Sequence, residues 1–288
     1  MEKGLRSHCS YRLMNLLAHK RRAALLTALL TLAWAVPVLA EIQPYKARYS
    51  IYRNGSLTGK VEVMMAQEGE QWVIKSKGSG THGLARILRA SDTEQVIGRL
   101  HEGRFRPDQY SRHTRVAGID DEWFATFDWD LRQVSVVHDG DETFNLALTE
   151  NALDPLSLKL EMRRRVSDPD PDLSFHMVEE DEIDEQNFRV LRTEWLETSL
   201  GCLETTPVEK VRHNSKRYTR AWHAPELDNI EVRIEHGKTG GNHLEMRITE
   251  LNLNGESIIP RPGCSAMQTG AKKAEDLEDE AMEHPLIP

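Results

Sequence analysis

Apolar and polar side chains alternate along most of the chain after residue 44. Between Tyr45 and Ile51 every second side chain is apolar, and the Asn54-Gly55 pair that follows is typical of a tight hairpin turn. The same alternation returns, with turn residues between the segments, over 61–65, 123–129, 230–234 and 244–248. One apolar face opposite one polar face, at a period of two, predicts an antiparallel sheet with a single dry face.

One segment breaks this alternation and has the pattern of a helix. Asp154 is a favourable N-cap and Pro155 suits the first helical position, so we expect a helix that runs to about Val166. Its apolar residues form two stripes, Leu153, Leu156 and Leu160 on one side and Leu158, Met162 and Val166 on the other. The predicted fold is therefore mainly β: a curved antiparallel meander sheet or half-open barrel with one prominent helix packed on its concave side.

The first 40 residues have the pattern of a secretory signal peptide. Lys and Arg recur between residues 3 and 22, an apolar run covers 23–36, and Val38-Leu39-Ala40 supplies the cleavage positions. The run is shorter than the roughly 20 residues that span a bilayer, so an uncleaved anchor helix is the less favoured alternative. The sequence predicts export to the periplasm, cleavage after Ala40, and no stable membrane span afterwards.

Composition and charge narrow the expected partners. Residues 1–40 hold six basic and one acidic residue, so their removal changes the net charge from −9 to −14. Such an acidic chain is a poor candidate for binding nucleic acid, which requires neutralising phosphates. Residues 41–254 suit a single β-rich domain. From residue 255 to 288 the apolar pattern stops and Pro, Gly, Lys and Glu dominate, so we expect a disordered tail.

Two cysteines, Cys202 and Cys264, follow the predicted cleavage site. In an oxidising compartment they could form a disulfide. Because Cys264 lies in the Pro/Gly-rich tail, two free thiols are the favoured alternative, and the pairing stays open.

Two motifs resemble ligand sites but lack features that the chemistry needs. Residues 78–83 match G-x-G-x-x-G, yet hairpins flank them instead of the βαβ unit that binds a dinucleotide, so we expect a flexible glycine turn. The acidic residues between Asp168 and Glu185 could offer oxygen ligands to calcium. The EF-hand pattern fails because Leu173 stands where a glycine is needed, so a solvated loop is favoured. The sequence predicts no cofactor.

Histidines and carboxylates give no stronger catalytic or metal site. His236 and His243 flank a glycine-rich turn, but neither they nor His213 and His223 have metal-ligand spacing. No nucleophile motif occurs, so no catalytic residue is predicted. Glu194 and Glu197 flank Trp195 and would be the acid–base pair of an envelope polymer hydrolase. Since residues three apart on a strand point to opposite faces, the hydrolase is the least favoured function.

Aromatic and methionine side chains gather on the face expected to be concave. A curved sheet often leaves a cavity, so this face could enclose an apolar ligand. The alternative is that the helix and the facing strands fill the space as ordinary core. The residues concerned are Tyr45, Tyr49, Met65, Trp72, Trp123, Phe127 and Trp129.

Several short motifs, in this order, carry a resemblance to a known family. They are Tyr45-Lys46-Ala47-Arg48-Tyr49 with Gly55 and Gly59, Asp154-Pro155-Leu156-Ser157, residues 200–205, Trp222-His223-Ala224-Pro225-Glu226-Leu227, and Val232-Arg233-Ile234-Glu235. Together, over residues 45–253, they resemble the bacterial exported proteins grouped as domain of unknown function 3108. The chain departs from the family pattern at residues 229–231, where an aromatic residue and a proline are expected.

The resemblance implies a periplasmic, mainly antiparallel β domain of Gram-negative bacteria and transfers no catalytic residue. Its outline, a curved sheet over a helix, is similar to the lipoprotein carriers of the Lol system, a likeness of fold that does not determine function. We therefore expect a binding module whose concave face takes a lipid or another apolar envelope molecule. A non-enzymatic scaffold that binds envelope proteins is the alternative. A cavity of several hundred Å³ favours the first, and a filled interior with an exposed apolar patch favours the second.

Overall fold

The computed structural model describes residues 42–140, 142–213 and 216–265. The predicted signal peptide and its cleavage site lie outside the described residues, as does the tail after residue 265. Among the residues that are described, no helix combines the length and the apolar character that crossing a membrane requires.

The first half of the described chain is an antiparallel meander in which each strand pairs with the next. A short helix, α2 (Gly83–Ile87), lies in the connection between its third and fourth strands. The strands are β1 (Tyr45–Arg53), β2 (Ser56–Glu68), β3 (Gln71–Gly80), β4 (Ser91–His101), β5 (Arg104–Val116), β6 (Ile119–Asp128), β7 (Gln133–His138) and β8 (Glu142–Ala147).

The second half extends the same sheet from the other side of β1. Strand β1 also pairs with β16, and β15, β14, β13 and β11 follow in that order. The elements are β9 (Ala152–Leu153), α3 (Pro155–Arg165), β10 (Ser174–Val178), β11 (Ile183–Val190), β12 (Glu194–Thr198), β13 (Gly201–Lys210), β14 (Arg217–Ala224), η2 (Pro225–Leu227), β15 (Ile230–Lys238), β16 (His243–Leu253) and β17 (Glu256–Ser257).

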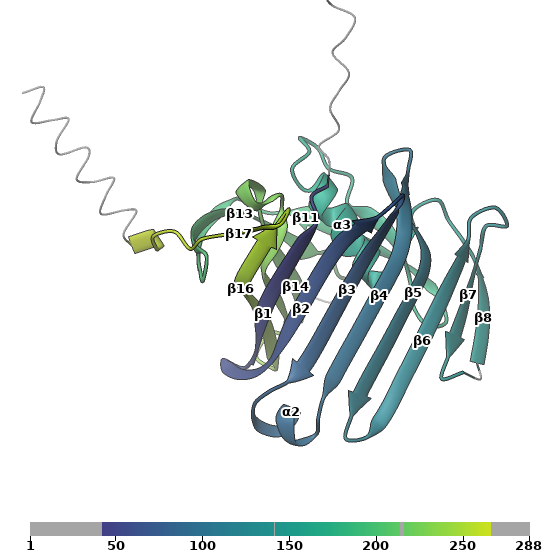
Figure 1. Ribbon diagram of the computed structural model, residues 1–288, viewed down its shortest axis with the longest axis horizontal. Coiled ribbons are helices and arrows are strands. Elements are labelled where there is room, and N and C mark those ends of the chain that lie inside the picture. Colours follow the sequence, from purple (N-terminus) through teal and green to yellow (C-terminus); the bar gives the residue numbers. More distant parts are fainter. Residues whose placement is uncertain (1–41, 141, 214–215, 266–288) are drawn as a thin grey trace, which may run out of the picture. The chain divides into compact units, whose positions relative to one another are not determined.

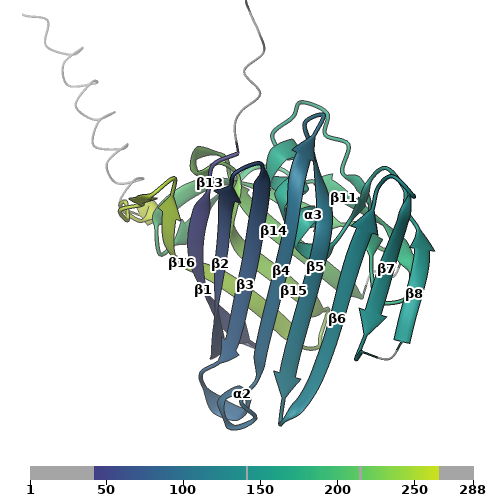
Figure 2. The same cartoon turned by 45° about the vertical axis from the view of Figure 1, so that its right-hand side comes forward.

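The long sheet curves so that its two halves face each other. In Figures 1 and 2, strands β13–β16 lie behind strands β1–β5, and α3 lies between the two halves toward one end. Strand β10 pairs with β11 and, in parallel, with the short β9. Within the described residues the end strand β8 pairs only with β7, so the sheet is open and not a closed barrel. The predicted fold class is confirmed.

Helix α3 contacts apolar side chains on both sides, as its two stripes predict. The Asp154 carboxylate caps the helix by accepting hydrogen bonds from the backbone N–H groups of Leu156 and Ser157. Leu156 and Leu160 belong to the main core beneath strands β1–β7. The second stripe packs with β10 and β13 in a separate cluster of Leu158, Met162, Val166, Phe175 and Val208, which Leu153 joins instead of the first stripe. The helix therefore separates two apolar spaces.

The segment after β16 differs from the expected tail. Residues 256–257 form β17 against β16, and the Arg261 N–H donates to the Leu200 carbonyl. Cys202 and Cys264 form a disulfide, so the preference for free thiols is wrong. Disorder beginning at residue 255 is also wrong for residues 256–265. Composition could not show this order because it comes from long-range backbone hydrogen bonds and one cross-link.

The glycine motif at residues 78–83 is part of a strand end and not a flexible turn. Gly78 and Gly80 lie within β3. A Cβ at Gly80 would stand 2.5 Å from the Ala85 carbonyl oxygen, so the absence of a side chain lets the α2 turn pack directly on the strand. These glycines serve close packing.

Candidate functional site

The aromatic face that was expected to line a ligand cavity is mostly filled core. Tyr49, Met65, Trp72, Trp123 and Phe127 are buried in the main cluster, and Tyr45 and Trp129 pack against its edge. The pocket that borders Tyr45 and Met65 measures about 20 Å³, roughly the space of one water molecule. The space beside Tyr45 and Met65 is therefore too small for a lipid.

Two members of that face, Phe127 and Trp129, also border a surface groove of about 410 Å³. Most of the other side chains lining the groove are charged, among them Arg99, Arg106 and Asp108, and Arg99 and Asp108 form an ion pair at 3.0 Å. An apolar ligand would not be held by such a groove.

The second apolar space, on the other side of α3, contains an open pocket of about 300 Å³. It lies between the helix and the concave face of strands β10, β11 and β13–β16. Its apolar lining comes from Pro155, Leu158, Met162, Met177, Phe188, Val208, Ala221, Ile234 and Met246. Most of these residues come from segments separated by long stretches of sequence.

Strand β14 shows why the space stays open. Thr219, Ala221 and His223 alternate along the strand and all border the pocket. Thr219 and Ala221 are too small to reach the helix. The three methionines around them have flexible, unbranched side chains that adapt to different occupants. The sequence therefore builds a pocket wall here, where the other half of the sheet places tryptophans.

One end of the pocket is positively charged. Lys210 and Arg212 border it, and neither has an ion-pair partner within 4 Å in the part of the chain that the structure describes. Burial, together with the nearby Arg212, lowers the pKa of the Lys210 ammonium, while Glu179 and Asp184 act in the opposite direction. The Arg212 guanidinium donates to Thr219 Oγ1 at 3.1 Å, but its buried Nε has no partner among the described residues.

The other end of the pocket holds a fully buried histidine, His223. Its Nδ1 lies 2.9 Å from the carbonyl oxygen of Asn229, so Nδ1 is the donor and carries the proton. Burial lowers the pKa of the ring and so favours its neutral form, while the charge of Glu231 acts in the opposite direction. Nε2 is then an acceptor, and among the described residues it has no partner. A buried acceptor without a donor is costly and marks a place for a ligand donor.

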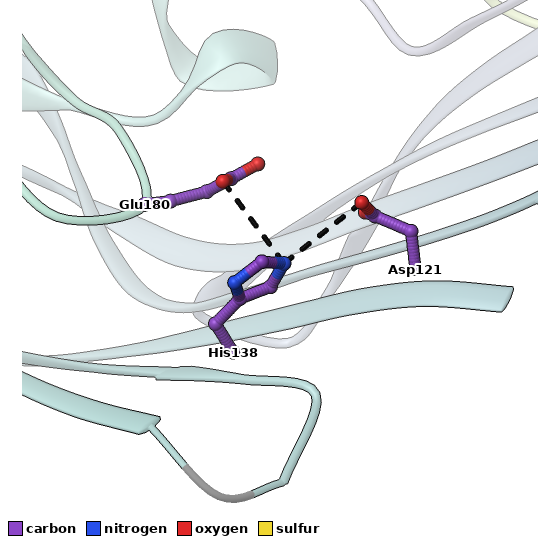
Figure 3. A group of neighbouring side chains, drawn as sticks. All are labelled: Asp121, His138 and Glu180. Carbon is purple, nitrogen blue, oxygen red and sulfur yellow. Dashed lines mark ion pairs between the residues drawn. The ribbon is translucent and has the colours of Figure 1, made fainter.

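A histidine and two carboxylates meet elsewhere, at the far edge of the sheet (Figure 3). His138 Nε2 lies 3.8 Å from Asp121 Oδ2 and 4.0 Å from Glu180 Oε2. These groups could ligate a divalent cation, but the separations exceed hydrogen-bond length and both carboxylates are exposed. We describe the group as a loose ion-pair cluster. It includes Glu180 of the acidic stretch in which calcium ligands were considered.

The histidines and glutamates considered from the sequence do not converge. His236 forms a hydrogen bond with Thr219 Oγ1, and His243 forms a separate one with the Tyr218 hydroxyl. Glu194 accepts from Trp222 Nε1, and Glu197 accepts from the backbone N–H of Cys264. Each glutamate thus has a structural contact of its own. The sequence signal that was missed is the small–small–His alternation on β14.

Fold and pocket together define a curved, open antiparallel sheet that encloses one helix and keeps an apolar pocket beside it. Residues 45–249 match the model of the family described as "Protein of unknown function (DUF3108)", and the chain belongs to this family. The resemblance stated from the sequence motifs is confirmed. The search of curated proteins found no match.

Solved structures support the fold. A β-barrel-like protein of domain of unknown function DUF1849 from Brucella abortus is similar with a TM-score of 0.52 at 9% identity, covering 74% of this chain and 98% of its own. Two others have low scores. A Bacteroides fragilis protein described as exported with a YmcC-like fold has a TM-score of 0.33 at 11% identity, covering 72% of this chain and 95% of its own. A Parabacteroides distasonis protein described as a lipoprotein has a TM-score of 0.31 at 8% identity, covering 73% of this chain and 95% of its own.

Proposed function

We propose that the protein binds an apolar or amphiphilic molecule of the cell envelope in the pocket beside α3. The observation that carries the proposal is the pocket itself, about 300 Å³ of space lined mainly by aliphatic, methionine and aromatic side chains. Its volume lies at the lower end of the range for small-molecule sites, which are mostly apolar with a few placed polar groups. The proposed ligand site therefore lies on the opposite side of the helix from the aromatic face that the sequence suggested.

The polar groups at its two ends favour a single-chain amphiphile with an acidic head. Lys210 and Arg212 supply cations at one end, and a carboxylate or phosphate would satisfy the unpaired Arg212 Nε. His223 lies four residues from Thr219 along β14, about 13 Å away at strand spacing. The pocket thus has the length for a short hydrocarbon chain between the cations and the buried His223 acceptor, with Lys159, Gln186 and Glu231 as further polar lining.

Export to the periplasm is part of the proposal and rests on two supports. The N-terminal residues carry the signal-peptide pattern. The Cys202–Cys264 disulfide is typical of proteins that fold in an oxidising compartment. The scaffold alternative stays a prediction.

The test is a titration of the purified protein with a dansyl-labelled medium-chain fatty acid, followed by dansyl fluorescence. We expect saturable binding that Ala221→Trp abolishes, because the indole fills the pocket. Leu131→Trp is the matched control, since it adds the same indole to an exposed turn far from the pocket. Equal binding by Ala221→Trp and the wild type would refute the pocket.

The head group is tested separately with Arg212→Gln and with an uncharged methyl ester of the same probe. We expect Arg212→Gln to weaken binding of the acid about tenfold and to leave binding of the ester unchanged, as a lost charge-assisted hydrogen bond predicts. Equal affinity of the wild type for acid and ester would refute the acidic head and leave the pocket intact.

A further inference from the structure

Exposed aliphatic side chains gather at one end of the sheet. The turn between β1 and β2, the α2 connection, the β5–β6 turn and the β15–β16 turn all lie there, and Figure 1 shows α2 beside the β5–β6 turn. We call the exposed aliphatic residues of these four connections the apolar rim: Leu57, Leu84, Ile87, Val116, Ile119 and Leu244. Ile87 and Ile119 are about three-quarters exposed, at 76% and 74%.

Backbone hydrogen bonds hold the four connections together at this end of the sheet. The Asn54 N–H donates to the His243 carbonyl at 2.8 Å, linking the β1–β2 and β15–β16 turns. The Thr81 N–H donates to the Thr58 carbonyl at 2.9 Å, which links α2 to β2. The Ala117 N–H donates to the Leu88 carbonyl at 2.8 Å and so attaches the β5–β6 turn to α2.

Helix α2 presents its aliphatic residues to solvent and does not bury them. None of its five residues is buried, although two of them are Leu84 and Ile87. The close packing of Gly80 on Ala85 holds the connection against β3, so these side chains cannot fold back onto the sheet. Several exposed aliphatic side chains gathered at one end of a domain are typical of a surface that meets an apolar partner.

Several cations lie among the rim residues, in a chain whose net charge is −9, while Asp120, Asp121 and Glu122 follow Ile119 on β6. Within the described chain, Arg53, Arg86, Arg89 and Lys238 have no ion-pair partner within 4 Å, while Arg115 forms an ion pair with Asp120. The acidic groups at this end, Asp121, Asp139 and Glu180, instead surround His138 beyond the rim. The rim therefore combines exposed aliphatic tips with unneutralised cations.

We propose that the apolar rim docks the protein on an anionic lipid surface. Aliphatic side chains at the tips of separate turns can enter the interface between head groups and acyl chains, while Lys and Arg contact anionic head groups. A fluid surface accommodates several separated tips at once, and its charge is complementary to Arg86 and Arg89. This proposal does not depend on the pocket. The two proposals are compatible. Arg217, at the start of β14, lies opposite Lys238 in the β14–β15 strand register, so the charged end of the pocket lies at the same end of the sheet as the rim.

The test measures co-sedimentation of the purified protein with phosphatidylcholine vesicles, with and without phosphatidylglycerol. We expect binding to the anionic vesicles that weakens with salt, as screened charges require. The double variant Leu84→Ser/Ile87→Ser should lower the partition coefficient about tenfold or more, because two aliphatic groups no longer enter the interface. Arg86→Gln/Arg89→Asn should remove the preference for phosphatidylglycerol.

The matched control is Leu100→Ser/Leu131→Ser, which removes two exposed leucines at the opposite end of the sheet. It should bind vesicles as the wild type does. All variants change exposed residues, and Ile119→Ser provides a second rim variant should the α2 pair affect folding. Vesicle binding that is absent in the wild type, or that is equal in rim and control variants, would overturn the proposal. If the wild type did not bind vesicles but could be cross-linked to a protein that the rim variants no longer cross-link, the rim would bind a protein and the lipid proposal would be wrong.

Discussion

The two halves of the sheet face the same helix but fill the space beside it differently. Strands β1–β7 contribute Trp72, Trp123 and Phe127 to the main core that Leu156 and Leu160 of α3 also join, and they leave about 20 Å³ beside Tyr45 and Met65. The β10–β16 half places small and flexible side chains opposite the helix and leaves about 300 Å³. Large aromatic residues on a concave face therefore indicate core in this protein, and the space lies where the wall residues are small.

The largest expected effect comes from truncating the packed half. Trp123→Ala should lower the free energy of unfolding by about 3–5 kcal/mol, because a buried aromatic ring is lost and a cavity remains. Trp123 is 4% exposed and contacts the Tyr110 ring at a centroid distance of 4.5 Å. Denaturant unfolding measures the change. An effect below 1 kcal/mol, as is usual for a surface residue, would show that this half is not the rigid core.

The disulfide is the next largest contribution, and it strengthens the half that is less well filled. Cys202 and Cys264 close a loop of 62 residues. Cys264→Ser should lower the free energy of unfolding by about 2–4 kcal/mol, mainly by restoring conformational freedom to the unfolded chain. Thiol titration of the unfolded wild type, with and without reductant, checks the bond itself. Two reactive thiols without reductant would contradict the pairing.

A matched pair of alanines tests the difference in packing directly. Ala125 on β6 is fully buried in the packed half, and Ala221 on β14 borders the pocket. Ala125→Phe should lower the free energy of unfolding by about 1–3 kcal/mol through overpacking. Ala221→Phe should change it by less than about 1 kcal/mol, since the ring enters space already present. Similar costs for the two substitutions would remove the distinction between the halves.

A pH dependence is expected at the N-terminal cap of helix α3, which the two halves share. Burial raises the pKa of Asp154 to about 6, against the hydrogen bonds from Ser157. A carboxyl with a raised pKa binds its proton more tightly in the folded state. Its contribution to stability is therefore greatest below the unfolded pKa of about 3.9 and is lost as the pH rises through about 6.

Asp154→Asn keeps an oxygen that caps the helix but cannot ionise. Relative to the wild type, the free energy of unfolding of this variant should be about 2 kcal/mol larger near pH 8 than near pH 4, so the variant gains relative stability as the pH rises. Asp170→Asn, at an exposed carboxyl just after the same helix, serves as the control and should show no comparable change. A difference between Asp154→Asn and the wild type that is constant with pH would contradict the raised pKa.

The sequence predicted those features that depend on neighbouring residues. Alternation and the Asn54-Gly55 pair predicted the hairpins, and Asp154 with Pro155 predicted the start of α3. The pairing of β1 with β16, nearly the whole domain apart, has no local signal. The same is true of the bond between Cys202 and Cys264, because both depend on how the sheet curves. The notable residue of the pocket, His223, appeared in the sequence only as one histidine among several.

The central claim is that the β10–β16 half holds a ligand and the β1–β7 half does not. Native mass spectrometry of the protein purified from cells of its own organism, beside Ala221→Trp, tests it most directly. The account predicts an additional mass of several hundred daltons on the wild type that extracts into organic solvent and is absent from Ala221→Trp. A wild type that carries no additional mass and takes up none when fatty acids are offered would contradict it.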